Sequence, residues 1–222
     1  MKYSLKTLIW LSIISFPLSG CMVKSKEKNK ENTNSTVDQK VLDEKVYELE
    51  NIDNYTLTET PVSMPEGAQY ARIQKVTYST WYVEQTSIDN SYILYIVLDY
   101  DRENDIVAQY TSEDCITWSK NVYTEETMQQ AYKESFNQAS AGRFIEYYKD
   151  AVVTQDGKEY TYRYSTEEQT QIIKILFTLD ANNQLTIKMD VRQTFIQDDY
   201  SVHIKMDVYD FGDTTFDVIY KS

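Results

Sequence analysis

The sequence predicts an α+β domain in which a meander of antiparallel strands dominates and a few helices cover it. Three observations lead to this fold class. Apolar and polar residues alternate through most of the last third of the chain, which is typical of strands with one buried face. Tyr supplies 20 of the 222 residues and favours pleated, half-buried surfaces. Short turn-prone segments separate the strand-like runs, so successive strands are expected to pair antiparallel.

The chain begins with a segment that is typical of a secretory signal. Lys2 and Lys6 precede an apolar stretch of about eleven residues that ends at Leu18. A helix of that length cannot span the roughly 30 Å of membrane hydrocarbon, but it matches the core of a signal peptide. We therefore expect residues 1–20 to be removed, and they are excluded from the fold.

The segment Leu18-Ser19-Gly20-Cys21 resembles the bacterial lipobox. The resemblance implies that a diacylglyceryl group is attached to the thiol of Cys21 and that the peptide bond before it is cut. Two acyl chains suffice for lasting attachment to a membrane. The expected location is therefore the extracytoplasmic face of a cell membrane. The 17 Lys against five Arg are typical of a Gram-positive bacterium with AT-rich genes.

Residues 21–36 are polar, lack apolar periodicity and are expected to form a flexible tether with an r.m.s. span of roughly 20 Å. Two interpretations of its lysines stay open: they lie against anionic headgroups, or they keep a spacer soluble. These lysines are Lys24, Lys26, Lys28 and Lys30. Residues 37–222 are expected to form one β-rich domain.

Helices are expected at three places in this domain. Apolar spacings of three and four predict an amphipathic helix that ends at about Leu49. Thr124 is expected to cap a second helix, which starts at Glu125 and carries an apolar stripe through Phe136. A third helical segment is expected over residues 143–150.

Strands are expected before, between and after these helices, and an Asp156-Gly157 turn is expected to open the last group. Strands with one apolar face need a cover, and the predicted helices are the candidates to supply it. The strand-like runs are 55–57, 69–86, 92–100, 105–111, 115–122, 160–164, 173–179, 185–191, 202–208 and 216–220.

This order of elements resembles the lipoprotein-carrier-like superfamily, the LolA/LppX-type fold. A helix after a lipid tether, a long meander, a helical insertion and a final hairpin at 210–218 carry the resemblance, which covers roughly residues 37–222. It implies an incomplete antiparallel β-barrel, a half-barrel, whose concave face is closed by helices and accommodates acyl chains or other apolar ligands. No ligand residue of that family can be carried over to a position of this chain.

Tyr160, Tyr162 and Tyr164 share one face of a predicted strand and are the candidate ligand-binding residues. Two interpretations stay open for this tyrosine stripe. It is either a cross-strand aromatic ladder that supports the sheet or one wall of a ligand groove.

Side chains suited to catalysis or metal binding are few. His203 is the single His and falls on the polar phase of its strand, Cys115 is expected in a half-buried strand, and the carboxylates of residues 99–105 are expected in an acidic turn. Tyr110 stands where a calcium loop needs its bidentate Glu. We therefore expect no enzyme, no metal and no cofactor other than the covalent diacylglycerol at Cys21.

The charge balance makes nucleic acid an unfavourable partner. Residues 1–30 contain six Lys and one Glu, which leaves 16 basic against 34 acidic side chains in residues 31–222. Two functions from different classes remain. The leading one is a surface lipoprotein that binds a lipid or another hydrophobic molecule, and the alternative is a protein- or wall-interaction module of the cell envelope without a ligand cavity. The oligomeric state is not predicted.

Overall fold

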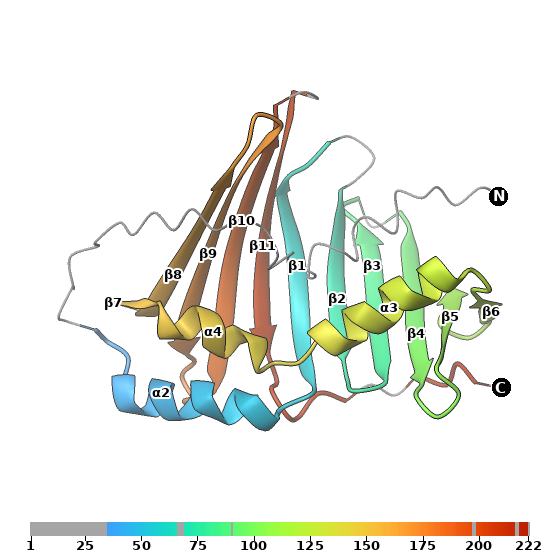
Figure 1. Cartoon of the computed structure of the whole chain (residues 1–222), viewed down its shortest axis with the longest axis horizontal. Helices are drawn as coiled ribbons and strands as arrows, with labels where there is room; N and C mark the ends of the chain where they lie inside the picture. Colours follow the sequence, from blue (N-terminus) through green and yellow to red (C-terminus); the bar gives the residue numbers. More distant parts are fainter. Residues whose placement is uncertain (1–34, 66–68, 90, 197–198, 216–217, 222) are drawn as a thin grey trace.

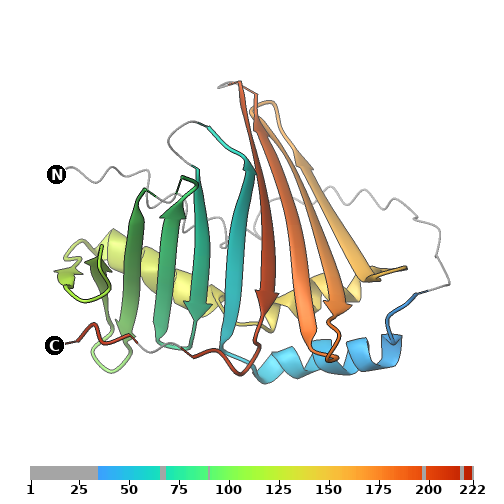
Figure 2. The same ribbon diagram turned by 180° about the vertical axis from the view of Figure 1, so that it is seen from behind.

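A computed structural model describes residues 35–65, 69–89, 91–196, 199–215 and 218–221. In these residues eleven strands form one open antiparallel sheet, and three α-helices lie on the same side of it (Figures 1 and 2). The expected α+β class with mainly antiparallel strands is confirmed.

The strands follow one another in the sheet with a single jump. Their order is β6-β5-β4-β3-β2-β1-β11-β10-β9-β8-β7. The bounds are β1 (Tyr55–Ser63), β2 (Tyr70–Val76), β3 (Thr80–Ser87), β4 (Ile93–Asp101), β5 (Ile106–Ser112), β6 (Ser119–Val122), β7 (Val152–Thr154), β8 (Gly157–Ser165), β9 (Gln169–Leu179), β10 (Leu185–Phe195) and β11 (Tyr200–Tyr209).

Two meanders therefore make up the sheet. The first runs outward from β1 to β6, and the second runs inward from β7 until β11 pairs with β1. The helices between β6 and β7 carry the chain from one edge of the sheet to the other (Figure 1). The helices thus separate two halves of one sheet.

The first helix, α2 (Gln39–Glu48), is followed by a 3₁₀ turn, η1 (Leu49–Asn51). The side chain of Asp38 accepts hydrogen bonds from the backbone N–H groups of Lys40 and Val41 and so caps the start of α2. The apolar stripe of α2 is buried, as its spacing predicts.

The other helices are α3 (Glu126–Gln138) and α4 (Arg143–Lys149). The stripe expected on α3 faces the sheet, and Phe136 packs edge-on against Trp81 of β3 with ring centroids 6.2 Å apart. The predicted cap at Thr124 is wrong, because Glu125 occupies the N-cap position and its side chain makes no capping bond.

Three strand predictions need correction. The run 69–86 is a hairpin, β2 and β3, because the Thr77 side chain accepts the Thr80 N–H at 3.0 Å and closes a turn without Gly or Pro. Cys115 is not in a strand: it has φ +61° in the loop before β6, where Asp114 accepts two backbone N–H groups.

The third correction concerns the carboxyl-terminal end of the chain. The predicted hairpin at 210–218 is a turn at Asp210–Asp213, and residues 218–221 form no strand. The described residues after β11 lie past the ends of the strands and on the outer face of β4 and β5, where Tyr220 packs against Tyr110 with ring centroids 5.0 Å apart (Figure 2). We call residues 210–215 and 218–221 the terminal strap.

The signal segment 1–20, Cys21 and the tether through residue 34 lie outside the described residues. The described chain starts at the β7–β8 turn, where the N–H of Thr36 donates to the carbonyl of Gln155 at 2.8 Å. In the described part of the chain, no helix is both long and apolar enough to cross a membrane.

Candidate functional site

The tyrosine stripe lies on the helix side of β8, as its alternation predicts. Tyr160, Tyr162 and Tyr164 are half-buried, and Tyr160 contacts Tyr147 of α4 with ring centroids 5.4 Å apart. Burial raises the pKa of Tyr160 and Tyr162, so both hydroxyls stay protonated at neutral pH. Tyr160 and Tyr162 both pack against the hydrophobic core, so the stripe supports the sheet whether or not it also lines a ligand groove.

A line of apolar side chains crosses the same side of four neighbouring strands. The strand register aligns Tyr162 of β8 with Ile173 of β9, Val191 of β10 and Ile204 of β11. We call these four residues the apolar row. Adjacent strands lie about 4.8 Å apart, so the row is about 14 Å long. The helices cross the lower part of these strands, and β8–β11 extend beyond them (Figure 1).

The helix side becomes polar where the sheet passes from β11 to β1. Glu59 accepts hydrogen bonds from Arg72 at 3.0 Å and from Gln74 at 2.7 Å, and Arg72 also donates to Gln85 at 3.0 Å. The Trp81 N–H donates to the amide oxygen of Gln74 at 2.9 Å. We call these five residues the polar cluster. They come from three adjacent strands. They place two charged groups on the helix side of the sheet, among packed side chains.

Burial dominates the electrostatics of the polar cluster. The side chains of Glu59 and Arg72 are 4% and 13% exposed. Burial raises the pKa of Glu59 above its ordinary value, and the charge and hydrogen bond of Arg72 only partly oppose the shift. Glu59 therefore needs Arg72 beside it to stay charged.

The polar cluster continues an apolar line of the sheet. Register aligns Ile175, Met189 and Met206, on β9, β10 and β11, with Glu59 on β1. The line then continues through Arg72 on β2 and Gln85 on β3. Along this line the apolar side chains end at β11 and the polar side chains begin at β1.

Sequence reasoning missed the polar cluster, although a signal for it existed. Tyr55, Leu57 and Glu59 occupy the same phase of β1, and the first two are buried apolar residues. An acidic residue on the buried phase of a strand indicates either a partner or a site. The partner could not be named, because residues 69–86 were expected to be one strand.

His203 lies on the outer face of the sheet, away from the helices, as its phase predicts. Its Nε2 is 3.0 Å from Asp190, which also accepts a 2.8 Å hydrogen bond from Arg192. Burial alone would raise the pKa of Asp190, but the hydrogen bonds from Arg192 and His203 outweigh it and lower that pKa. The group ties β10 to β11.

Two further sequence candidates have local structural roles. Asp101 accepts the backbone N–H groups of Glu103 and Asn104, both at 3.1 Å, and so forms the expected acidic turn. Burial, with the charges of Glu84 and Asp114, raises the pKa of the Cys115 thiol. Within the described residues, no three His, Cys, Asp or Glu side chains gather in a group that could hold a metal ion.

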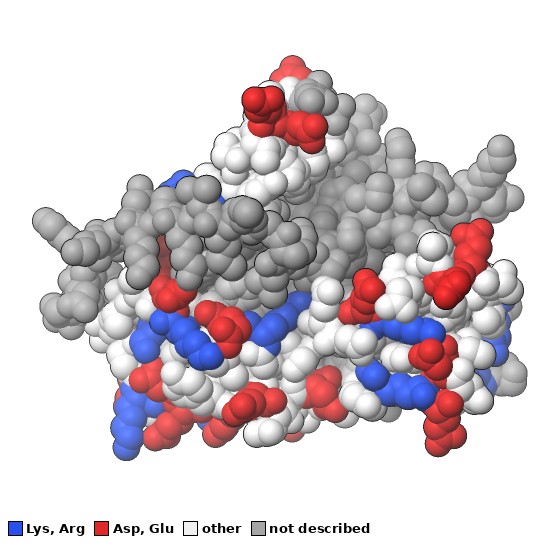
Figure 3. Space-filling model, viewed as in Figure 1, with Lys and Arg blue, Asp and Glu red and all other residues white. Residues whose placement is uncertain are grey.

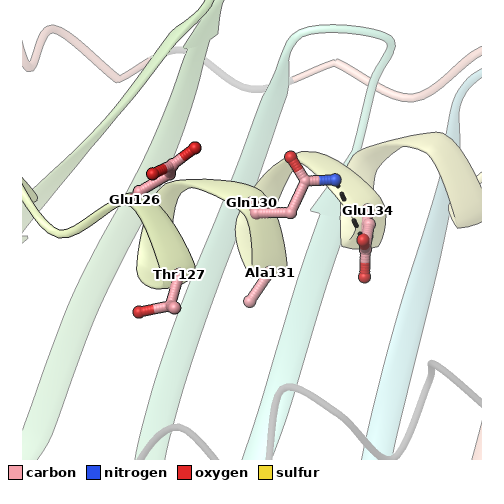
Figure 4. A pocket seen from close by; sticks show the side chains of 5 residues that line it. All are labelled: Glu126, Thr127, Gln130, Ala131 and Glu134. Carbon is pink, nitrogen blue, oxygen red and sulfur yellow. Dashed lines mark hydrogen bonds between the residues drawn. The ribbon is translucent and has the colours of Figure 1, made fainter.

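A shallow depression of about 500 Å³ lies on the outer side of α3 (Figure 4). Its lining residues are exposed and carry two carboxylates, which do not suit an apolar ligand: Glu126, Thr127, Gln130, Ala131 and Glu134. Seen from the side shown in Figure 1, acidic and basic side chains are mixed over the helices (Figure 3).

The chain matches no protein-family model. No curated protein matches it either.

Proposed function

We propose that this chain is a non-enzymatic lipoprotein of the extracytoplasmic membrane face that holds a lipid or another hydrophobic molecule against the apolar row. The observation that carries the proposal is the register that aligns four apolar side chains on the helix side of β8–β11. Each methylene buried there contributes about 0.8 kcal/mol. In this proposal the open sheet is the half-barrel expected from the sequence, and the helices close its lower part.

The lipid anchor belongs to the same proposal. The lipobox-like segment supports attachment at Cys21, and the described chain begins at the β7–β8 edge of the sheet, beside the strands that carry the apolar row. Ser35 lies fourteen positions after Cys21, with thirteen residues between them. Fully extended, they reach at most about 50 Å. The membrane therefore lies close enough to supply the ligand.

Labelling cells with a fatty acid tests the anchor. The wild-type protein and the Cys115→Ser variant, which keeps the other cysteine, are expected to take up label and remain in the membrane fraction. Cys21→Ser is expected to lose the label and leave that fraction. An unlabelled wild-type protein would contradict the anchor.

Native mass spectrometry of protein purified from membranes tests the ligand. We expect a co-purifying lipid on the wild type and less of it on Tyr162→Ser/Tyr164→Ser, because both rings lie on the helix side of β8. Thr161→Ala/Arg163→Ser is the matched control, since these residues alternate with them on the same strand. Lipid-free wild-type protein would count against the function.

One observation favours the alternative, an envelope interaction module. Tyr160, the first residue of the tyrosine stripe, is already packed against α4 and so serves the core. If no lipid co-purifies, and crosslinking in living cells returns one consistent protein or wall polymer, this second function replaces the first.

A further inference from the structure

The outer face of β8–β11 has the opposite charge balance to the rest of the chain. Residues 31–222 contain 16 basic and 34 acidic side chains. Alternation along these four strands places five of the basic but only three of the acidic side chains on the outer face. The acidic ones are Glu159, Asp190 and Asp207, and the basic ones, which we call the cationic face, are Arg163, Lys174, Lys188, Arg192 and Lys205.

The basic side chains of this face are more exposed than the acidic ones beside them. Arg192 is 62% exposed and its partner Asp190 is 25% exposed. Lys174 is 51% exposed and its partner Glu159 is 27% exposed. Lys188 and Lys205 are exposed too, and neither makes an ion pair with a described residue. A surface that approaches the outer face therefore meets cations first.

The strand register gathers these cations. One register line carries Arg163 and Arg192, and the next line carries Lys174 and Lys205. Two such lines lie about 7 Å apart, and β8–β11 span about 14 Å. Asp190 is the one acidic residue on the two lines.

The cationic face is open and lies near the start of the described chain. All three α-helices are on the other side of the sheet (Figure 2), and the terminal strap lies on β4 and β5. The described chain starts at the β7–β8 turn, next to β8. The opposite edge strand, β6, is ten strand spacings from β7, or about 48 Å along the sheet. The tether from Cys21 thus reaches the domain beside this face.

We propose that the cationic face lies on the membrane that holds the anchor and binds its anionic lipid headgroups. This inference rests on the proposed lipid anchor and adds the orientation of the anchored domain. The helix side of the sheet, with the apolar row, then faces the cell envelope. The partner is a surface of anionic headgroups, because a broad open face with projecting cations matches a plane of negative charge.

The net negative charge of the domain does not prevent this contact. Screening limits electrostatic attraction to charges within about 10 Å of the membrane at 0.1 M salt. The carboxylates on the helices lie on the far side of the sheet when the outer face is in contact. Each Lys or Arg near an anionic surface favours binding by about fivefold.

The opposite orientation is unfavourable. With the helix side on the membrane, the exposed carboxylates of α3, which include Glu126 and Glu134, would lie against headgroups of the same charge. The anchored domain is therefore expected to keep one side towards the membrane.

Fluorescence quenching of the anchored protein tests the orientation. The lipidated protein, in a Cys115→Ser background, carries a fluorophore at Thr194→Cys on the outer face or at Gln130→Cys on α3, both exposed positions. Vesicles contain a lipid with a spin-labelled headgroup, which quenches at short range. In vesicles of phosphatidylglycerol and phosphatidylcholine we expect at least about threefold more quenching at position 194 than at position 130. In phosphatidylcholine alone we expect equal quenching.

Two variants test whether charge causes the orientation. Lys188→Gln/Lys205→Gln is expected to reduce the ratio in anionic vesicles to the value in neutral ones, because it removes the two cations without an ion pair to a described residue. Lys40→Gln/Lys149→Gln is the matched control, since it removes the same charge from the helices at side chains that are 88% and 53% exposed. This control is expected to keep the ratio.

Each outcome decides the inference. Equal quenching at the two positions in anionic vesicles, or stronger quenching at position 130, overturns it. An unchanged ratio in neutral vesicles or in Lys188→Gln/Lys205→Gln overturns it as well. Equal quenching, with soluble polyphosphate binding to the wild type and not to Lys188→Gln/Lys205→Gln, would assign the face to a phosphate-containing wall polymer instead. A wild type that floats with neither kind of vesicle overturns the anchor, and this inference with it.

Discussion

Arg72 is the residue on which the charge balance of the polar cluster depends. It lies 3.0 Å from Glu59 on the helix side of the sheet, where Glu59 is buried and Arg72 is mostly buried, with 13% of its side chain exposed. Leaving one partner of a buried pair without the other is far more costly than replacing both. The two residues therefore act as a unit, and single substitutions should reveal it.

Arg72→Met is expected to lower the free energy of unfolding by about 3–5 kcal/mol at neutral pH. Burial raises the pKa of Glu59 above its ordinary value of 4.5, and losing the arginine raises it further. A raised carboxyl pKa costs no stability below the unfolded-state pKa, and stability is lost as the pH rises through the folded-state value. Urea unfolding at about pH 4 and about pH 7.5 should show the loss mainly at the higher pH.

Glu59→Leu/Arg72→Met is the control for this prediction. It removes both charges, so its stability should stay near that of the wild type at both pH values. If Arg72→Met loses the same free energy at both pH values, Glu59 is not the group whose ionisation matters.

Among the elements, those with strong periodicity could be predicted from the sequence. Leu185, Ile187, Met189 and Val191 alternate, and β10 buries all four.

The β2–β3 hairpin could not be predicted, because its turn is closed by Thr77 and lacks Gly or Pro. As one strand, residues 69–86 would place Arg72 and Gln85 on opposite faces, since their separation is odd; the hairpin makes them cross-strand neighbours. The polar cluster was missed for this reason.

The prediction for the terminal strap was also wrong. Its apolar residues alternate because they pack against a face of the sheet, and they do not pair with a strand. Tyr220 packs on Tyr110 and Trp118, its hydroxyl donates to Asp99 at 3.1 Å, and Lys221 pairs with Asp99 at 2.8 Å. The strap thereby covers the small apolar cluster on the outer face of β3, β4 and β5.

Tyr220→Ala is expected to lower the free energy of unfolding by about 2 kcal/mol, roughly half the cost of removing a fully buried aromatic side chain. Ile219→Ala is the matched control, because Ile219 is 83% exposed and should change stability by less than about 0.5 kcal/mol. Chemical denaturation measures both. Equal effects of the two substitutions would show that the strap does not stabilise the outer face.

In the whole molecule, the pairing of β1 with β11 joins the two meanders. Seven residue pairs connect these strands, and the pairs include Leu57 with Val208 and Glu59 with Met206. These four side chains are buried on the helix side, whereas all four residues of the edge strand β6 are exposed. The lipid surface proposed on β8–β11 and the polar cluster on β1–β3 meet at this join, so one cooperative sheet must hold both.

Amide hydrogen exchange should therefore slow from the edges of the sheet to its centre. Backbone hydrogen bonds of β1 and β11 are expected to open only with global unfolding, while those of β6 and β7 open locally, because few buried side chains hold the edges. Exchange measured by NMR or mass spectrometry gives the order. β10 serves as an internal reference, since it pairs on both sides. Two results would contradict a single sheet held at the β1–β11 pair. One is amide exchange in β6 as slow as in β11, and the other is opening of β2–β6 as one unit while β8–β11 stay closed.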